Sequence, residues 1–293
     1  MMPDYHIGSL DEKSLALLAD AEPEAESDQS RPVFLQSKVW SKAILHEKRK
    51  ISADTKIFKF RLDHDAQIVG LPVGQHLMMR LRDPVTREAI IRAYTPISEG
   101  TEAGCLNVLI KIYYGTTDRT GGKMTQALDS IPLGHFVDFK GPVGKFEYLG
   151  KGDCTIGGKG RKVSRFVMVC GGSGITPIFQ VLRAVMKDRE DPTHCVVLDG
   201  NRVEEDILCK AELDAMAVVN KHKCNLIYTL SRPQASWSGR KGRVDKALVE
   251  KEVGPPPADH GSLVLICGPE SMEKTAHHIF TELGWADEDL LFF

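Results

Sequence analysis

The sequence predicts a β plus α/β protein, in which a small antiparallel barrel is followed by a parallel sheet with helices on both faces. Between about residues 33 and 150, short segments alternate apolar and polar residues and are separated by Gly/Pro turns, a pattern typical of antiparallel strands. From about residue 165, continuous apolar segments alternate with helical ones, as they do in parallel sheets. The length of 293 residues is enough for two domains of ordinary size.

Five segments of the first part are predicted to be strands, and one is predicted to be a helix. Turn-forming sequences such as Gly141-Pro142-Val143-Gly144 separate the strands. The predicted strands are residues 38–45, 56–62, 76–81, 106–114 and 136–140. The helix is predicted near residues 122–128, after a pair of glycines.

The second part begins with an apolar strand over 166–170, a glycine-rich loop and a helix over 177–187. Strand–helix alternation then continues through residues 195–198, 205–220, 225–230, 244–251, 263–267 and 271–283. We therefore expect one domain over 33–150, a connector over 151–164 and a second domain over 165–293. Residues 11–32 are predicted to form an acidic, solvated linker, and a linker so near the first residue leads us to expect a preceding part.

Composition argues against several classes of protein. The net charge of −2 and the pI of about 6.6 favour neither a nucleic-acid partner nor an anionic membrane surface. No apolar run approaches the ~20 residues of a membrane helix, and the first residues lack the apolar region of a signal peptide. We therefore expect a cytoplasmic protein. The 7 cysteines are never spaced as C-x-x-C, so no metal site is predicted and most are expected to be free buried thiols.

The loop Gly171-Gly172-Ser173-Gly174 lies between a predicted buried strand and a predicted helix. Backbone N–H groups and the positive end of a helix meet there, which suits an anionic pyrophosphate. The spacing is not the G-x-G-x-x-G of a standard dinucleotide fold, and a tight strand–helix turn without a ligand is the alternative. A hydrolase elbow would need Gly where Ile175 stands. A P-loop around Gly122-Lys123 is also excluded, because Thr117 and Met124 replace required residues.

The run Arg92-Ala93-Tyr94-Thr95-Pro96-Ile97-Ser98 combines a cation, an aromatic ring and hydroxyls. Arg92 offers a planar fork for a diphosphate, Tyr94 offers a flat face for a ring system, and Thr95 and Ser98 are small donors. A surface Arg beside a core Tyr would be the simpler interpretation of this run alone. The downstream glycine loop favours a ligand site.

Cys267-Gly268-Pro269 follows the apolar strand 263–266 directly. Ligands of open α/β sheets lie outside the carboxyl ends of the strands, so Cys170 and Cys267 are predicted at the rim of one crevice. Two core thiols are the alternative interpretation, more so for Cys170 than for Cys267.

Taken together, these residues resemble the flavin-and-nicotinamide reductase family that includes ferredoxin–NADP reductase and cytochrome b5 reductase. The patterns R-x-Y-[TS]-x-x-S, G-G-x-[MS]-[ST], G-G-[ST]-G-I-T-P and C-G-P-x-x-M occur in order, at residues 92–98, 121–125, 171–177 and 267–272. The resemblance spans residues 33–293. It implies an antiparallel six-stranded FAD-binding barrel, then a Rossmann-like parallel-sheet domain for NAD(P)H.

Within that family the chain most resembles the reductase part of eukaryotic assimilatory nitrate reductases of the fungal type. Residues 2–8 resemble the tail of a cytochrome b5 haem domain, so residues 1–32 are expected to be that tail and the acidic linker. The His-Pro-Gly-Gly haem motif is absent, so haem and molybdopterin are expected only in a preceding part, through which a homodimer is possible. The alternatives are a free-standing NADH-cytochrome b5 reductase and, in another class, a nucleotide-binding module without turnover.

The resemblance also assigns site residues. FAD is expected to contact a set from the barrel: Arg92, Ala93, Tyr94, Thr95, Leu109, Lys111, Tyr113, Gly122, Lys123, Met124 and Thr125. The nicotinamide nucleotide is expected to contact Gly171, Gly172, Ser173, Gly174, Cys267, Gly268 and Pro269, while Thr176 reaches the flavin. Cys267 and Thr95 are expected to be catalytic. The implied reaction takes hydride from NADPH onto FAD and passes single electrons to a cytochrome b5-type haem domain.

Two features bear on the choice between NADPH and NADH. Ser231 and Arg232 follow the strand 225–230, and Ser plus Arg at such a strand end can hold a 2′-phosphate, as in NADP-using members of the family. The NADH-using cytochrome b5 reductases tend to have Asp at the position of Ser231. Against this, Glu204-Glu205-Asp206 could hydrogen-bond a free ribose, which is an NADH feature. We expect NADPH, with NADH possible; a solvated basic loop is the alternative.

Overall fold

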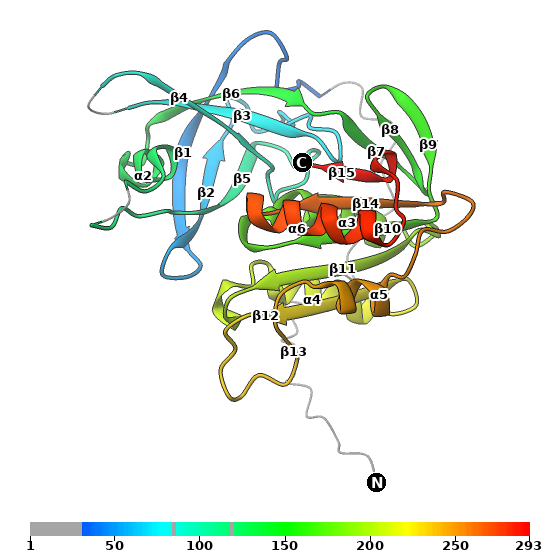
Figure 1. Cartoon of the computed structure of the whole chain (residues 1–293). Coiled ribbons are helices and arrows are strands. Elements are labelled where there is room, and N and C mark those ends of the chain that lie inside the picture. Colours follow the sequence, from blue (N-terminus) through cyan, green and yellow to red (C-terminus); the bar gives the residue numbers. More distant parts are fainter. Residues whose placement is uncertain (1–30, 84–85, 118–119) are drawn as a thin grey trace.

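The computed structural model describes residues 31–83, 86–117 and 120–293. The predicted haem-domain tail and nearly all of the acidic linker lie outside the described residues. Figure 1 shows two sheet-based parts side by side, with the antiparallel sheet in blue to green and the parallel sheet in green to red. In the described ranges, no helix is long and apolar enough to cross a membrane.

The first part is a six-stranded antiparallel sheet, which confirms the predicted architecture. Its hydrogen-bonded order is β4-β3-β6-β1-β2-β5. The strands are β1 (Ser41–Lys50), β2 (Thr55–Arg61), β3 (His76–Arg82), β4 (Ala89–Tyr94), β5 (Cys105–Lys111) and β6 (Phe136–Val143). The sequence predicts β4 only as an extended segment, yet it carries Arg92 and Tyr94 and pairs with β3.

One core fills the curled sheet, and all six strands contribute to it. Phe34, Phe58, Phe60 and Phe139 are its largest fully buried members, and the last two meet edge to face at 4.9 Å between ring centroids. Helix α2 (Lys123–Ser130) packs on the same core through Met124 and Leu128. A single core shared by both edge strands requires strong curvature, because a flat sheet would separate them.

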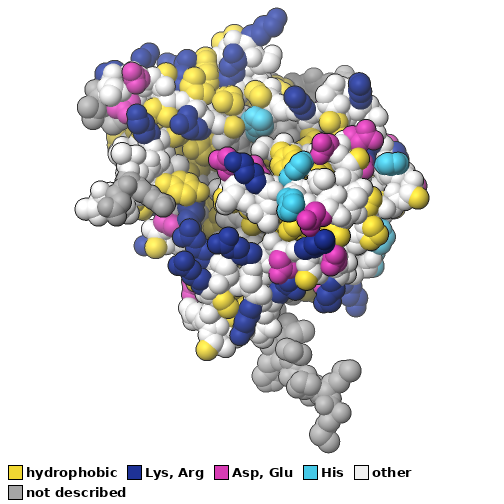
Figure 2. Space-filling view, in the orientation of Figure 1, with side chains coloured by type: hydrophobic (Ala, Val, Ile, Leu, Met, Phe, Trp, Pro, Cys, Tyr) yellow, Lys and Arg dark blue, Asp and Glu magenta, His cyan; other side chains and the backbone are white. Residues whose placement is uncertain are grey.

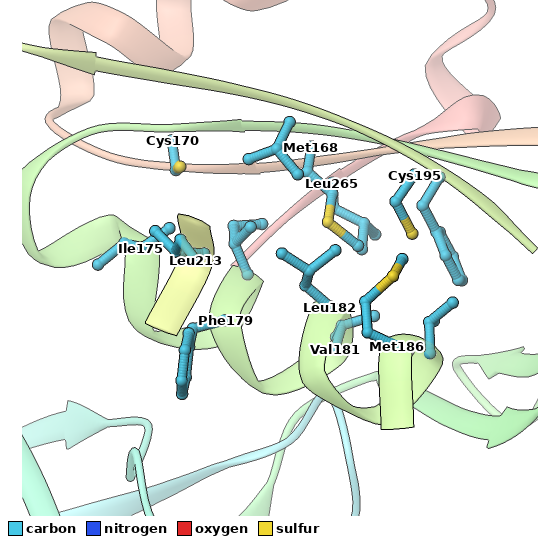
Figure 3. Close-up of a cluster of buried hydrophobic side chains, with 14 of the residues drawn as sticks. Met168, Cys170, Ile175, Phe179, Val181, Leu182, Met186, Cys195, Leu213 and Leu265 are labelled. Atoms are coloured by element: carbon cyan, nitrogen blue, oxygen red, sulfur yellow. The ribbon is translucent and has the colours of Figure 1, made fainter. Parts of the chain in front are cut away.

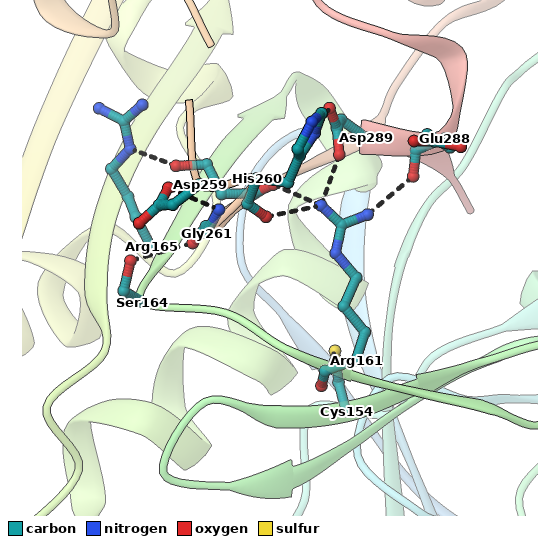
Figure 4. Close-up of polar contacts among 10 residues, drawn as sticks. Cys154, Arg161, Ser164, Arg165, Asp259, His260, Gly261, Glu288 and Asp289 are labelled. Atoms are coloured by element: carbon teal, nitrogen blue, oxygen red, sulfur yellow. Dashed lines mark hydrogen bonds and ion pairs between the residues drawn. The ribbon is translucent and has the colours of Figure 1, made fainter. Parts of the chain in front are cut away.

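The segment 151–164, expected to be a simple connector, contains two strands. A three-stranded meander is formed by β7 (Phe146–Gly150), β8 (Asp153–Ile156) and β9 (Lys159–Lys162). Arg161 holds it to the far end of the chain, where its guanidinium donates to the backbone of Glu288 and to the carboxylate of Asp289 (Figure 4). These partners are more than a hundred residues away in sequence, so local pattern does not predict them.

The second part is a parallel sheet in the order β13-β12-β11-β10-β14-β15. Its strands are β10 (Arg165–Cys170), β11 (His194–Asn201), β12 (Cys224–Leu230), β13 (Arg240–Lys241), β14 (Ser262–Cys267) and β15 (Leu290–Phe292). The chain starts at β10, proceeds to β11 and β12, and then returns to the other side at β14. The strand order therefore reverses between β10 and β14, which is where ligands of such sheets bind.

Alternate residues of β10 face opposite layers of helices. Phe166, Met168 and Cys170 belong to the core beneath α3 (Ile175–Lys187) and α4 (Lys210–Val219), part of which Figure 3 shows. Val167 and Val169 belong to the core beneath α5 (Lys246–Glu252) and α6 (Glu270–Glu282). The continuous apolar pattern of β10 thus reflects burial on both faces.

Helix α3 also joins the two parts of the molecule. Its Gln180 accepts a hydrogen bond from the N–H of Gly74 at 2.7 Å, and its Arg183 donates to the carbonyl of Ile97 at 2.5 Å. Lys187 of the same helix forms an ion pair with Glu99 at 2.9 Å. Spacings of three and four residues put these side chains on one face of α3. The helix that begins at the glycine loop is therefore fixed against the antiparallel sheet.

Candidate functional site

The glycine loop lies at the point where the strand order reverses. Gly172–Gly174 form a single 3-10 turn, η1, after β10. A Cβ on Gly174 would lie 2.2 Å from the carbonyl oxygen of Cys267, and one on Gly171 would lie 2.6 Å from that of Gly200. Gly172 has a φ of +56°, and a Cβ there would meet no atom within 4 Å. Close packing thus requires glycine at 171 and 174, whereas Gly172 faces open space.

The second predicted segment meets the loop directly. Cys267 ends β14, Gly268 follows it, and Pro269 precedes α6 as its N-cap residue. A Cβ on Gly268 would lie 2.8 Å from the sulfur of Met272, so this turn is also closely packed. The structure therefore brings residues 171–174 and 267–269 together at one edge of the sheet.

Both thiols of this edge are neutral at ordinary pH. Cys170 and Cys267 are paired residues of the adjacent strands β10 and β14. Burial and the neighbouring Asp199 raise the pKa of Cys170, and burial with Glu273 raises the pKa of Cys267 to about 12. Cys170 is fully buried, whereas Cys267 is partly exposed. A thiol with so high a pKa supplies shape and polarity rather than a thiolate nucleophile.

Arg92, Tyr94 and Tyr113 lie together beside the antiparallel sheet. Arg92 pairs with Met79 and Tyr94 with Leu77 across β3 and β4, so both occupy one face of β4, while Ala93 between them is exposed. Burial raises the pKa of Tyr94 to about 12; Arg92 opposes this rise and Tyr113 adds to it. Both effects act on Tyr94, so Arg92 and Tyr113 lie near enough to its hydroxyl to influence it.

The start of α2 is attached to Tyr113. Gly122, its N-cap residue, donates its N–H to the carbonyl of Tyr113 at 2.8 Å, and the N–H of Tyr113 donates to Thr125 Oγ1 at 3.2 Å. Met124 anchors the helix in the core, while Lys123 remains exposed. A helix N-terminus without acidic residues in its first turn, next to an exposed lysine, suits an anion.

These residues fit a dinucleotide with a planar ring. Arg92 and Lys123 provide exposed cations, and the ring of Tyr113 is 51% exposed beside the half-buried Tyr94. Thr95 follows β4 and is buried. The donor set therefore matches a diphosphate next to an aromatic face, as FAD would present.

Leu109 and Lys111, both expected beside FAD, lie where β5 meets the parallel part of the molecule. Leu109 is buried in the core cluster of that part of the molecule. Lys111 forms ion pairs with Asp206 at 2.8 Å and with Asp54 at 3.1 Å. Burial opposes the charge of Lys111, but the bonds to these carboxylates raise its pKa overall. Both residues lie on the face of β5 that meets the second part, and β5 also contacts η1.

Thr176 stabilises the glycine loop from within. It lies in the first turn of α3, is buried, and donates its hydroxyl to the carbonyl of Ser173 at 3.2 Å. The Thr176 side chain therefore contacts the loop and lies at the start of α3, the helix that contacts the antiparallel part.

The predicted 2′-phosphate residues directly follow β12 and are hydrogen-bonded to the residues that end and follow β11. The N–H of Ser231 donates to Asn201, and that of Arg232 donates to Arg202 at 2.8 Å. Sequence reasoning missed Arg202, although its place directly after an apolar strand is a usable signal. Figure 2 shows Lys and Arg side chains gathered around the carboxyl edge of the parallel sheet.

Two of the three carboxylates that favoured NADH are already engaged. Asp206 is paired with Lys111, and Glu205 accepts a hydrogen bond from Gln234 at 3.0 Å. Arg240 of β13 pairs with Asp245 at 2.6 Å. Among the described residues, no group of three or more His, Cys, Asp or Glu is arranged to hold a metal ion.

Comparison with known proteins agrees with this division of the chain. A family described as an oxidoreductase FAD-binding domain matches residues 42–148, and one described as an oxidoreductase NAD-binding domain matches residues 168–278. All of the chain is similar to the nitrate reductase [NADPH] of Beauveria bassiana, at 59% identity over 295 residues, but it spans only 33% of that relative.

Two further relatives are covered nearly completely. The NADH-cytochrome b5 reductase 2 of Danio rerio is 37% identical over 256 residues, which are 84% of this chain and 82% of the relative. The crystal structure of the cytochrome b5 reductase domain of Ulva prolifera nitrate reductase superposes with a TM-score of 0.83 at 34% identity, covering 89% of this chain and 100% of that one.

Proposed function

This chain belongs to the cytochrome b5 reductase family of FAD-dependent NAD(P)H oxidoreductases, and from that premise we propose that it is the reductase module of a fungal-type nitrate reductase. In this proposal it takes hydride from NADPH onto FAD and passes single electrons to a b-type haem domain. Nitrate would be reduced elsewhere in the intact cytoplasmic protein, which would also contain the haem and the molybdopterin. All of this chain is similar to about a third of the fungal NADPH nitrate reductases, and this similarity supports placing it with them within the family.

One observation carries the proposal. The 3-10 turn of the glycine loop contacts β5. Helix α3 starts at that turn and is hydrogen-bonded to Gly74 and Ile97 of the antiparallel part. A nucleotide on the loop and a flavin beside Tyr94 and Tyr113 would therefore meet at one rigid junction. A positioned pair of reactants is the main contribution that a protein makes to such a transfer.

The antiparallel part would hold FAD through Arg92, Lys123 and the start of α2. FAD supplies the redox chemistry when bound, because it accepts hydride and releases electrons singly. Tyr94, held neutral by its raised pKa, offers its ring and a donor hydroxyl. Thr95 is the buried hydroxyl next to it and would contact the ring system.

The parallel part would hold the nucleotide on residues 171–174 and 267–269. Gly172 leaves space for the pyrophosphate, and the positive end of α3 favours its charge. Cys267 is neutral and partly exposed at the carboxyl end of β14. We assign it the role of limiting how closely the nicotinamide ring approaches.

An anaerobic titration of the purified protein with NADPH and, separately, NADH tests the proposal. A yellow protein whose flavin absorbance is bleached by about one equivalent of NADPH is expected. Bleaching by NADH alone would favour a free-standing NADH-cytochrome b5 reductase. A colourless protein that binds nucleotide without turnover would leave only a nucleotide-binding module.

The coenzyme preference has its own test. Replacing Ser231 by Asp together with Arg232 by Ala should raise the KM for NADPH by about tenfold or more, since a 2′-phosphate would lose charge-assisted bonds and meet a like charge. The KM for NADH should change little. Steady-state kinetics with ferricyanide as acceptor measures both. Lys246→Ala, which removes an exposed cation paired with Glu282, is the matched control, and equal effects on both coenzymes would overturn the assignment.

A further inference from the structure

Asp199 is a buried carboxyl group that the proposed chemistry does not use. It lies near the end of β11, is 1% exposed, and is paired across the sheet with Cys170 of β10 and Tyr228 of β12. Its Oδ1 accepts from Asn201 Nδ2 at 2.9 Å and from Cys170 Sγ at 3.6 Å. Within the described ranges, its Oδ2 has no hydrogen-bond partner. A buried carboxyl group with an unsatisfied oxygen destabilises the fold, so its presence calls for another role.

The amide of Asn201 connects this carboxyl group to the glycine loop. Its nitrogen donates to Asp199, and its oxygen accepts the N–H of Gly172 at 3.0 Å. Asp199, as an acceptor, therefore sets which end of the amide faces the loop. The backbone carbonyl of Asn201 in turn accepts a hydrogen bond from the N–H of Ser231. One residue thus contacts both predicted nucleotide-binding segments.

Gly172 is the loop residue whose conformation most needs support. Its φ of +56° is in the left-handed region, and its Cα faces open space rather than packed atoms. Gly172 is therefore held through its backbone: its carbonyl accepts the N–H of Ile175 within the turn, and its N–H is fixed by the bond to Asn201. If the amide turned over, a donor would face a donor and the loop would shift.

We propose that Asp199 is a positioning residue for the nucleotide: by orienting the amide of Asn201, it holds Gly172 and the open face of the loop in the shape that receives a pyrophosphate. The proposal rests on the proposed function, because it assumes that the loop binds NADP(H). It adds a residue that makes no contact with the nucleotide and acts through Asn201.

The protonation state of Asp199 provides an independent readout. Burial raises its pKa to about 7, while the bonds from Asn201 and Cys170 oppose the rise. The titratable groups around it are Cys170 of β10, Tyr228 of β12, which donates to Asp214 of α4, and Cys209, on which Arg183 of α3 also acts. The ionised form is the better acceptor for the amide. Nucleotide affinity should therefore fall as the pH drops through about 7.

Titration of the FAD-loaded protein with NADP+, followed by the flavin difference spectrum, tests the proposal. Asp199→Leu, which removes the acceptor, should raise the Kd about tenfold, and Asn201→Ala should do the same. The double variant should be no worse than Asn201→Ala alone, because both act on one bond to Gly172. Asp199→Asn keeps an acceptor and should recover most of the affinity, but its Kd should lose the extra pH dependence that the unaltered protein shows near 7. The 2′-phosphate of NADP+ also titrates near this pH, but it does so equally with the unaltered protein and with Asp199→Asn, so its effect cancels when the two Kd profiles are compared.

Asp214→Asn is the control, since it removes a carboxylate from the same neighbourhood without touching the loop, and its Kd should be unchanged. An unaltered Kd in Asp199→Leu, or the same pH dependence in Asp199→Asn, overturns the positioning role. Failure of the unaltered protein to bind NADP+ would instead overturn the proposed function. Flavin content reports the folding of the antiparallel part, and the thermal unfolding midpoint from circular dichroism reports that of the parallel part, which contains the substituted residues.

Discussion

Cys267→Ser should slow the reduction of bound FAD by NADPH by about a hundredfold, the cost of misplacing reactants by ~1 Å, and should leave FAD content unchanged. Cys267 ends β14 where a Cβ on Gly174 would contact its carbonyl oxygen at 2.2 Å, so its backbone cannot move to compensate for a smaller side chain. Stopped-flow measurement of flavin absorbance gives the rate directly.

The raised pKa of Cys267 also predicts how the rate of FAD reduction depends on pH. With a pKa of about 12, the thiol stays protonated between about pH 6 and 9, so the rate should show no inflection from this group. Cys105→Ser, in the antiparallel part, is the control and should leave the rate of FAD reduction unchanged. An unchanged rate in Cys267→Ser would make Cys267 a structural residue.

Arg92→Ala should weaken FAD binding by about a hundredfold, because a diphosphate would lose a bidentate, charge-assisted contact worth ~3 kcal/mol. Arg92 is exposed on β4, and its Nη1 donates to its neighbour's carbonyl, that of Ile91, at 2.7 Å. That bond engages one guanidinium nitrogen and leaves the remaining N–H groups for a ligand. Fluorescence titration of the apoprotein with FAD measures the loss.

The neighbouring strand provides a matched comparison. Arg82 ends β3 and donates to the carbonyl of Arg87, so Arg82→Ala removes an exposed arginine of the same hairpin and should not change FAD affinity. Arg92→Lys keeps the charge without the planar fork, so its FAD affinity should lie between those of Arg92→Ala and Arg82→Ala. If Arg92→Ala and Arg82→Ala behave alike, Arg92 does not hold the diphosphate.

Local pattern was sufficient wherever the structure depends on neighbours in the chain. Five of the antiparallel strands, the strand–glycine–helix unit at residues 166–187 and the strand ending at Cys267 follow from periodicity and turn chemistry. Close packing explains why glycine occupies positions 171 and 174 of the predicted loop. Each of these features is determined within about ten residues, which is the range over which side-chain period and backbone preference act.

Contacts across the fold were not predictable in the same way. The strands within 151–164 were not expected, and Arg161 joins them to Asp289 near the far end of the chain, just as Lys111 pairs with Asp206 in the other part of the molecule. The sequence alone suggested a simple connector and indicated neither of these ion pairs.

The sequence by itself determined the order of the two sheets and the loops that a dinucleotide could use, because these depend on short-range periodicity and on glycine. Only the tertiary structure decided what supports those loops. Asp199 and Asn201 are ordinary polar residues in a strand until the parallel register puts Asp199 beside Cys170 and turns the amide of Asn201 to Gly172. That arrangement depends on burial and on the pairing of β10 with β11, which no local pattern encodes.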